Sequence, residues 1–182
     1  MKKVLIVLVA ALLCGATFAD EKPLQHVNER IAPPSHRTLD GQWCSTNTPL
    51  ALPDGNSAGI NDDLVITENE TIDSLTVDLQ VEHTWVGDII ASLSNGSCTI
   101  QLVHRLGTDL SSFGCSGDDI DITLDDAAAG SIEDACGSGP SGGAQGDFTP
   151  GDPTPNGLWP TAMADCVGET TAGTWTLNIS DN

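Results

Sequence analysis

Apolar and polar residues alternate most regularly over residues 74–85. Leu75, Val77, Leu79 and Val81 occupy every second position, and polar residues fill most of the positions between them. A period of two is typical of a strand that buries one face and exposes the other. This stretch therefore predicts a half-buried strand.

Shorter apolar runs with the same texture follow, separated by Gly, Asn, Asp and Pro. Asn95-Gly96 separates two of these runs and is a strong signal for a tight turn, so it predicts a hairpin. No window of ten residues beyond the N-terminal segment has the apolar stripe of a helix. Many short strands with regular turns predict an all-β fold, an antiparallel sandwich or barrel. The further runs predicted as strands are 64–67, 89–93, 99–103, 120–124 and 174–179.

Two stretches lack this pattern. Residues 137–160 are rich in Gly, Pro, Ser and Asp and predict a long loop. Residues 20–43 are polar, contain Pro23, Pro33 and Pro34 and show no apolar periodicity, so we expect a flexible tether. The folded domain is expected over residues 44–182.

The N-terminus has the order of a secretory signal. Lys2 and Lys3 precede an apolar run over residues 4–14, and small residues then lead to Ala19 and the charged residues 20–22. We expect residues 1–19 to be removed on export, which places the protein outside the cytoplasm, in the periplasm or the extracellular medium, with no membrane association after cleavage. The alternative is a lipoprotein anchor on Cys14, although the residue before it is not small.

The charge is strongly negative. Asp and Glu number 26 against 6 Lys and Arg, which gives a net charge of −20. Such a surface repels nucleic acid and anionic lipid, so neither is expected as a partner. Two explanations stay open: solvation of a secreted surface, or sites for divalent cations. Aspartates gather near the ends of predicted strands, at positions 88, 118, 119, 121, 125, 126 and 181, without the spacing of an EF-hand.

Five cysteines remain once the leader is removed, namely Cys44, Cys98, Cys115, Cys136 and Cys166. Their spacing matches no zinc motif, and in an oxidising compartment we expect disulfides. Because five is odd, one thiol is free, pairs with another chain or lacks its partner.

Catalytic motifs are weak. Residues 139–143 match the G-x-S-x-G pattern around Ser141, but no helix is predicted after it and no histidine follows His104. A surface position explains His83 and His104 better than a zinc or acid–base role, and no carboxylate pair stands out. We therefore expect no catalytic residues and no enzyme activity in this chain.

Several longer motifs resemble a known module. They are Ala51-Leu52-Pro53-Asp54, Ala58-Gly59, Glu82-His83-Thr84-Trp85-Val86-Gly87-Asp88, Phe113-Gly114-Cys115-Ser116-Gly117, Thr123-Leu124-Asp125-Asp126-Ala127, Phe148-Thr149-Pro150, Gly173-Thr174-Trp175-Thr176-Leu177 and Ser180-Asp181-Asn182. In order and spacing, from Cys44 to the C-terminus, they resemble the P domain, or Homo B domain, that follows the subtilisin-like catalytic domain in kexin, furin and bacterial secreted proteases. The resemblance implies a jelly-roll-like antiparallel β-sandwich that binds calcium. It also implies a non-catalytic accessory role beside a serine-type endopeptidase (proprotein convertase type), with a subtilisin-like catalytic domain or another extracellular protein as partner.

The resemblance also implies roles for single residues. Asp88, Asp125 and Asp126 match acidic positions expected to bind calcium, whereas Trp85 and Trp175 are expected to pack. Residues 151–168 depart from the family's pattern, and family members continue past the position of Asn182 into a final strand, so the resemblance implies a domain that is incomplete at its C-terminus.

The resemblance suggests a cysteine pairing as well. It implies a local bridge from Cys115 to Cys136, and an unpaired Cys44, whose partner in bacterial relatives lies on the final strand. Cys98 and Cys166 are then left for each other.

The alternative function is a stand-alone adhesion or glycan-binding module, which exposed aromatic residues in a groove would favour. Against this alternative, the chain has no tyrosine and only four tryptophans, Trp43, Trp85, Trp159 and Trp175.

Overall fold

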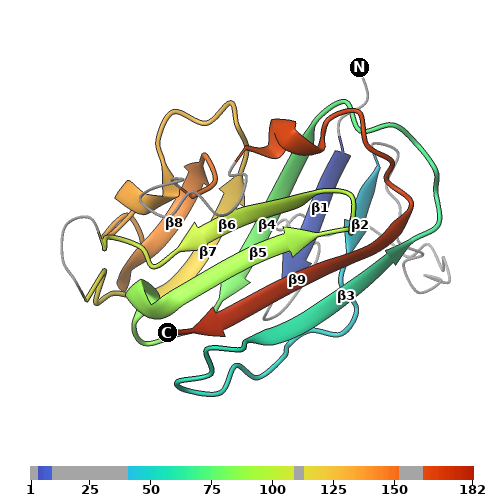
Figure 1. Cartoon of the computed structure of the whole chain (residues 1–182). Helices are drawn as coiled ribbons and strands as arrows, with labels where there is room; N and C mark the ends of the chain where they lie inside the picture. Colours follow the sequence, from blue (N-terminus) through green and yellow to red (C-terminus); the bar gives the residue numbers. More distant parts are fainter. Residues whose placement is uncertain (1–3, 10–40, 109–112, 152–161) are drawn as a thin grey trace, which may run out of the picture.

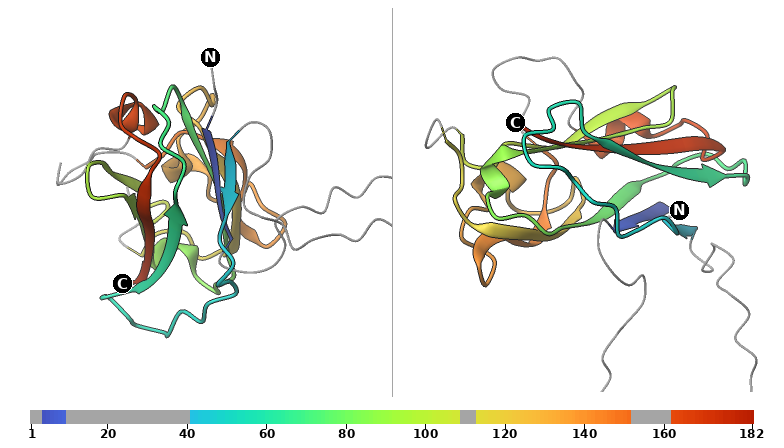
Figure 2. Two further views of the ribbon diagram at one scale, coloured as in Figure 1. Left: turned by 90° about the vertical axis from the view of Figure 1, so that its right-hand side faces the viewer. Right: turned by 90° about the horizontal axis from the view of Figure 1, so that it is seen from below.

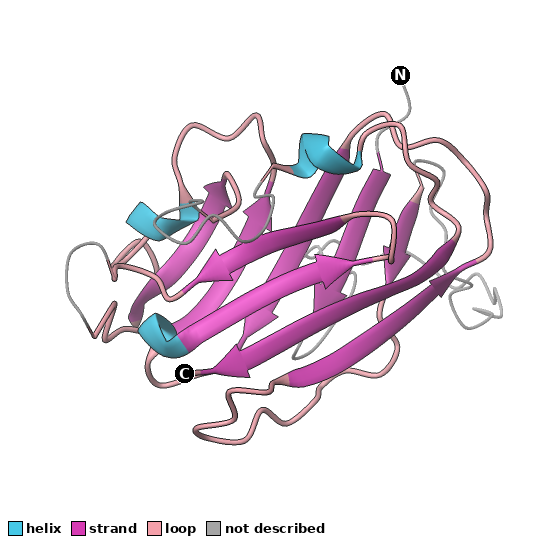
Figure 3. Ribbon diagram, viewed as in Figure 1, coloured by secondary structure: helices cyan, strands magenta, loops and turns pink. Residues whose placement is uncertain are grey.

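The computed structural model of the full chain describes residues 4–9, 41–108, 113–151 and 162–182. In these ranges the chain forms nine strands and three short 3-10 helices. The strands make two sheets that pack face to face, and the helices lie at the margins (Figures 1 and 3). The predicted all-β sandwich is therefore confirmed.

Each sheet mixes segments from distant parts of the sequence, and Figure 2 shows the two layers from the side. The five-stranded sheet has the order β2-β1-β4-β7-β8, with β2 at Gln42–Cys44, β1 at Val4–Val9, β4 at Leu75–Val81, β7 at Asp118–Leu124 and β8 at Gly142–Phe148. The four-stranded sheet has the order β3-β9-β5-β6, with β3 at Ile60–Ile66, β9 at Gly173–Asp181, β5 at Ile89–Ser94 and β6 at Thr99–His104.

The alternating stretch forms β4 as predicted. Leu75, Val77, Leu79 and Val81 are all buried, and the three residues between them are half-buried. Because successive strand side chains point to opposite faces, this one strand fixes which face of its sheet meets the core. The opposite sheet contributes in the same way, with a fully buried Trp175 on β9.

The Asn95-Gly96 hairpin also forms. β5 and β6 are antiparallel neighbours, and Gly96 has a φ of 87°. The side-chain oxygen of Asn95 accepts from the backbone N–H groups of Ser97 at 3.1 Å and Cys98 at 3.0 Å. The side chain therefore takes part in closing the turn that its sequence predicts.

The expected long loop at 137–160 is wrong at residues 142–148, because Gly142–Phe148 forms β8. This strand pairs parallel to β7, against the antiparallel expectation. A Cβ atom on Gly143 would overlap the backbone of Asp118, and one on Gly117 would overlap the backbone of Gly142. The glycines that suggest a loop in the sequence are the residues that let these two backbones approach. Residues 152–160 lie outside the described ranges.

The five-stranded sheet also contains segments that were not expected in the domain. Val4–Val9, which the sequence places in an expected leader, forms β1, and this strand runs parallel to both β2 and β4. Trp43 on β2 is 1% exposed, so this last residue of the expected tether packs in the core. Residues 20–40 of the expected tether lie outside the described ranges.

Candidate functional site at the His83 end of the sandwich

Polar and aromatic motif residues meet where β4 ends, β7 begins and β9 ends. After β4, the chain enters η1 (Val86–Asp88), which is held against the segment before β7. The N–H of Val86 donates to the carbonyl of Gly117 at 3.0 Å, and the N–H of Gly87 donates to that of Cys115 at 2.9 Å. The N–H of Asn182 donates to the carbonyl of Asp88 at 2.9 Å, which brings the end of β9 to the same place.

His83 lies at the centre of this end, and both of its ring nitrogens are engaged. Nδ1 is 3.1 Å from the backbone nitrogen of Trp85 and 2.9 Å from its carbonyl oxygen. Nε2 is 3.5 Å from Oδ2 of the buried Asp181, which also accepts from the N–H of Gly55 at 2.8 Å. The backbone of His83 makes two hydrogen bonds with Asp119. The N–H of His83 donates to the Asp119 carboxylate at 3.1 Å, and the carbonyl of His83 accepts from the N–H of Asp119 at 2.9 Å. With its ring and backbone taken together, His83 therefore links the end of β4 to the start of β7 and to the end of β9.

Asp88 pairs with a cation. Its Oδ1 lies 3.5 Å from Nη2 of Arg105, whose Nε donates to the carbonyl of Gly87 at 3.2 Å. Arg105 has a φ of 51°, a left-handed backbone conformation that directs the chain out of β6. No motif in the sequence indicated Arg105 as the partner of Asp88.

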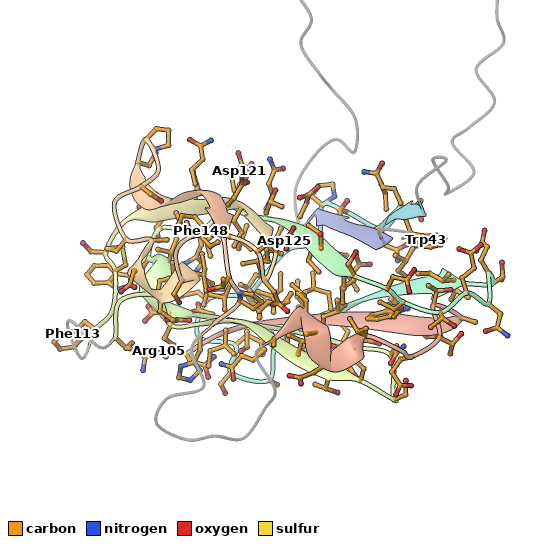
Figure 4. The ribbon with its side chains drawn as sticks, turned by 90° about the horizontal axis from the view of Figure 1, so that it is seen from above. Trp43, Arg105, Phe113, Asp121, Asp125 and Phe148 are labelled. Carbon is orange, nitrogen blue, oxygen red and sulfur yellow. A yellow bond between two sulfur atoms is a disulfide. The ribbon has the colours of Figure 1, made fainter. Side chains whose placement is uncertain are left out.

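The surface of this end carries two exposed aromatic rings. Phe113 is 71% exposed and Trp85 is 39% exposed, and the indole N–H of Trp85 donates to the carbonyl of Phe113 at 2.8 Å. Figure 4 shows Phe113 and Arg105 at one end of the molecule and Trp43 at the other. Trp175 packs in the core as expected, but Trp85 does not pack fully. This end therefore offers two aromatic side chains to a ligand.

The other two expected calcium ligands lie at the opposite end of β7. Asp125 follows the last residue of β7, where its Oδ1 accepts from the N–H of Ala127 at 2.9 Å. Both carboxylate oxygens of Asp126 are bound, by the N–H groups of Met163 at 2.8 Å and Ala164 at 2.7 Å. Asp126 thus caps η3 (Met163–Cys166), which starts 37 residues later in the sequence.

Asp88, Asp125 and Asp126 do not form one metal site. Asp88 lies beside the start of β7 and the other two lie beyond its end, and a seven-residue strand spans about 20 Å. Calcium ligands bind at 2.3–2.6 Å, so one ion cannot reach both ends. In the described ranges, no group of three or more His, Cys, Asp or Glu side chains is arranged to hold a metal. The structure therefore does not bring these three aspartates together: Asp88 pairs with Arg105, whereas Asp125 and Asp126 accept backbone N–H groups.

Ser141 lies in the turn before β8, so a strand and not a helix follows it. The carbonyl of Ser141 accepts from the N–H of Asp118 at 3.1 Å, on the β8 side of β7. His83 bonds to Asp119 on the opposite, β4 side of β7. Two inter-strand spacings, about 10 Å, separate Ser141 from His83. Ser141 and His83 are therefore not within hydrogen-bond reach of each other.

Both expected disulfides form. Cys115 and Cys136 have Cα atoms 5.7 Å apart, and Cys98 and Cys166 have Cα atoms 5.4 Å apart. The expectation of an unpaired Cys44 is wrong for the full chain, in which Cys44 is disulfide-bonded. The expected count of five left out Cys14, which lies in the expected leader, whereas the full sequence contains six cysteines. Disulfides are typical of proteins in oxidising compartments.

Comparisons with family models, with curated proteins and with solved structures found no match to this chain. In the described ranges, no helix is both long enough and apolar enough to span a bilayer.

Proposed function

We propose that this protein is exported and acts as a non-catalytic accessory module of the P-domain type. In this role it binds and stabilises a neighbouring extracellular protein, in the first instance a subtilisin-like serine protease. The leader sequence and the disulfides support export. The motif resemblance supports the class of module and partner.

The bonding of His83 is the observation that carries the proposal. A catalytic histidine needs one ring nitrogen available to a substrate or nucleophile. Here Nδ1 faces the Trp85 backbone and Nε2 faces Asp181, so the ring joins the ends of β4 and β9. In the motif of residues 82–88, the His83 ring thus stabilises the fold, and Trp85 stays exposed at the surface.

Calcium, which the resemblance implies, is not part of the proposal at Asp88, Asp125 and Asp126. Their carboxylates already accept backbone N–H groups or pair with Arg105. We take the acidic surface as solvating and as favouring a partner with basic groups.

Two measurements test the proposal. The purified exported protein should not hydrolyse casein or fluorogenic peptides, and the Ser141→Ala variant should behave identically. When a subtilisin-like catalytic domain from the same cells is mixed with the protein, its half-life at elevated temperature should increase. The Trp85→Ala variant should lose this effect, and Val65→Ala, which alters an exposed residue on β3, should keep it. Hydrolysis that disappears in Ser141→Ala, or no change in half-life, contradicts the proposal.

A second function is favoured by one observation, the exposure of Trp85 and Phe113 side by side. Such rings stack on sugar faces, so the alternative is an adhesion or glycan-binding module. Glycan-array binding that is lost in Trp85→Ala and retained in Val65→Ala would support it over the accessory role.

A further inference from the structure

The leader segment occupies an interior position of the five-stranded sheet. Val4–Val9 lies between β2 and β4 and runs parallel to both (Figure 1). Its register with β4 extends over six residue pairs, from Val4 with Leu75 to Val9 with Gln80. The inference below rests on one part of the proposed function, the removal of residues 1–19 on export.

Removal of this strand leaves two facing edges. In the described part of the chain, β4 keeps only β7 as a strand neighbour, and β2 keeps none. The N–H and C=O groups of β4 that pointed to β1 lose their partners, and unpaired strand edges readily add another strand. The space between β2 and β4 is two inter-strand spacings wide, about 10 Å, which fits one strand.

The side chains of β4 define what fits. Parallel partners in register point to the same face of a sheet, so an incoming residue opposite Leu75, Val77 or Leu79 faces the core and must be apolar. An incoming residue opposite Asp78 faces outward, beside a half-buried carboxylate that already accepts from the hydroxyl of Thr123 at 2.7 Å. A lysine, arginine or hydroxyl residue suits that position, and an acidic residue does not.

We propose that the exported protein uses the slot between β2 and β4 to bind an extended segment of a partner protein by strand addition. The segment has at least six residues, with apolar side chains at alternate positions and a basic or hydroxyl residue opposite Asp78. The strongly negative charge of the protein also favours a basic residue in the incoming segment. The leader segment occupies this position in the full chain.

The experiment uses the exported protein and two short peptides. The probe has the sequence of residues 2–11 with Val7, the residue opposite Asp78, replaced by Lys; the matched peptide carries Glu there. At an excess of about 100-fold over the Kd, the Lys peptide should raise the melting temperature by about 5 °C or more. It should also slow hydrogen exchange of the β4 amides at least tenfold. A Lys peptide that also contains Ile6→Pro should do neither, because proline removes a backbone donor.

A charge swap separates strand addition from nonspecific adhesion. The Asp78→Lys protein should prefer the Glu peptide over the Lys peptide, reversing the preference of the wild type by roughly tenfold in Kd. Equal binding of both peptides to both proteins, or β4 amides that exchange as slowly as those of β9 without peptide, overturns the inference. The inference is also overturned if the protein sediments as a dimer and does not bind the Lys peptide, since a second copy of the chain then occupies the slot.

The intact mass of the secreted protein keeps the two proposals distinguishable. If residues 1–19 are retained, the proposed processing fails and Val4–Val9 itself closes the slot, so the inference falls with it. If they are removed and the Lys peptide has no effect, only the inference fails.

Discussion

Gly87 and Gly114 lie with their backbones in direct contact. A Cβ atom on Gly114 would be 2.7 Å from the Cα of Gly87, and one on Gly87 would be 2.8 Å from the Cα of Gly114. Real Cβ atoms do not approach other carbons this closely, so neither position accepts a side chain without movement of the backbone. The contact sets η1, and with it Trp85 and Asp88, against the segment that leads to Cys115.

We expect Gly87→Ala to lower the free energy of unfolding by roughly 1–3 kcal/mol, measured by urea denaturation, because the methyl group forces two backbones apart. Gly130→Ala is the matched control, since its Cβ would meet only the ring of Phe148, at 3.9 Å. A similar loss in both variants would mean that the close contact is not the cause.

Asp126 should stabilise the fold without any metal. Asp126→Ala removes the acceptor for two N–H groups of η3, and we expect a loss of roughly 1–2 kcal/mol, as for a helix cap. Asp165→Ala, at an exposed carboxylate in the same helix, is the control. Melting curves with and without a calcium chelator should coincide for the wild type. A lower melting temperature on chelation would restore the calcium expectation.

The sequence predicted the elements that depend on adjacent residues, and it missed those that depend on contacts between segments far apart in the chain. The alternation of β4 and the Asn95-Gly96 turn are visible in a few adjacent residues, and both formed. β8 was missed because its glycines satisfy a contact with β7, and only the fold shows that the two backbones meet. The capping role of Asp126 was missed for the same reason, because its donors lie 37 and 38 residues away.

The two described disulfides should differ in what they contribute. Cys115–Cys136 spans 21 residues and Cys98–Cys166 spans 68. Loop closure in the unfolded chain predicts roughly 3 and 4 kcal/mol, respectively. We therefore expect the double variant Cys98→Ser/Cys166→Ser to unfold at lower urea than Cys115→Ser/Cys136→Ser. The reverse order would show that native contacts around Cys115, and not chain entropy, dominate.

Truncation of the two motif tryptophans should lower stability by different amounts. Trp175 is fully buried, and its indole N–H donates to the carbonyl of Thr171 at 2.9 Å. Trp175→Ala should therefore cost roughly 3–5 kcal/mol in unfolding free energy. Trp85→Ala should cost less than half of that, because the ring is partly exposed, while it removes partner or glycan binding. Equal losses of stability would assign Trp85 to the core and remove the surface on which both functional proposals depend.

Asp62 is a carboxylate on the core-facing side of β3. It is 5% exposed, and in the described structure its Oδ2 has no hydrogen-bond partner. Its Oδ1 accepts from the side-chain amide of Asn47 at 3.1 Å. The small cavity beside it, about 10 Å³, is lined mainly by the apolar side chains of Leu50, Ile60, Leu177 and Ile179, together with Thr48.

A buried oxygen without a donor destabilises a fold by about 1–3 kcal/mol, so Asp62→Leu should raise the free energy of unfolding. Asn47→Ala should lower it, because this change removes the donor to Oδ1 and leaves the whole carboxylate without one. The two effects should not add: in the Asp62→Leu background, Asn47→Ala should have almost no effect, which gives a coupling energy of about 1 kcal/mol or more. Urea denaturation of the four proteins measures this cycle. The prediction fails if Asp62→Leu destabilises the protein by as much as Asn47→Ala. That result would mean that Oδ2 of Asp62 has a hydrogen-bond partner in solution, and a single water in the cavity could be this partner.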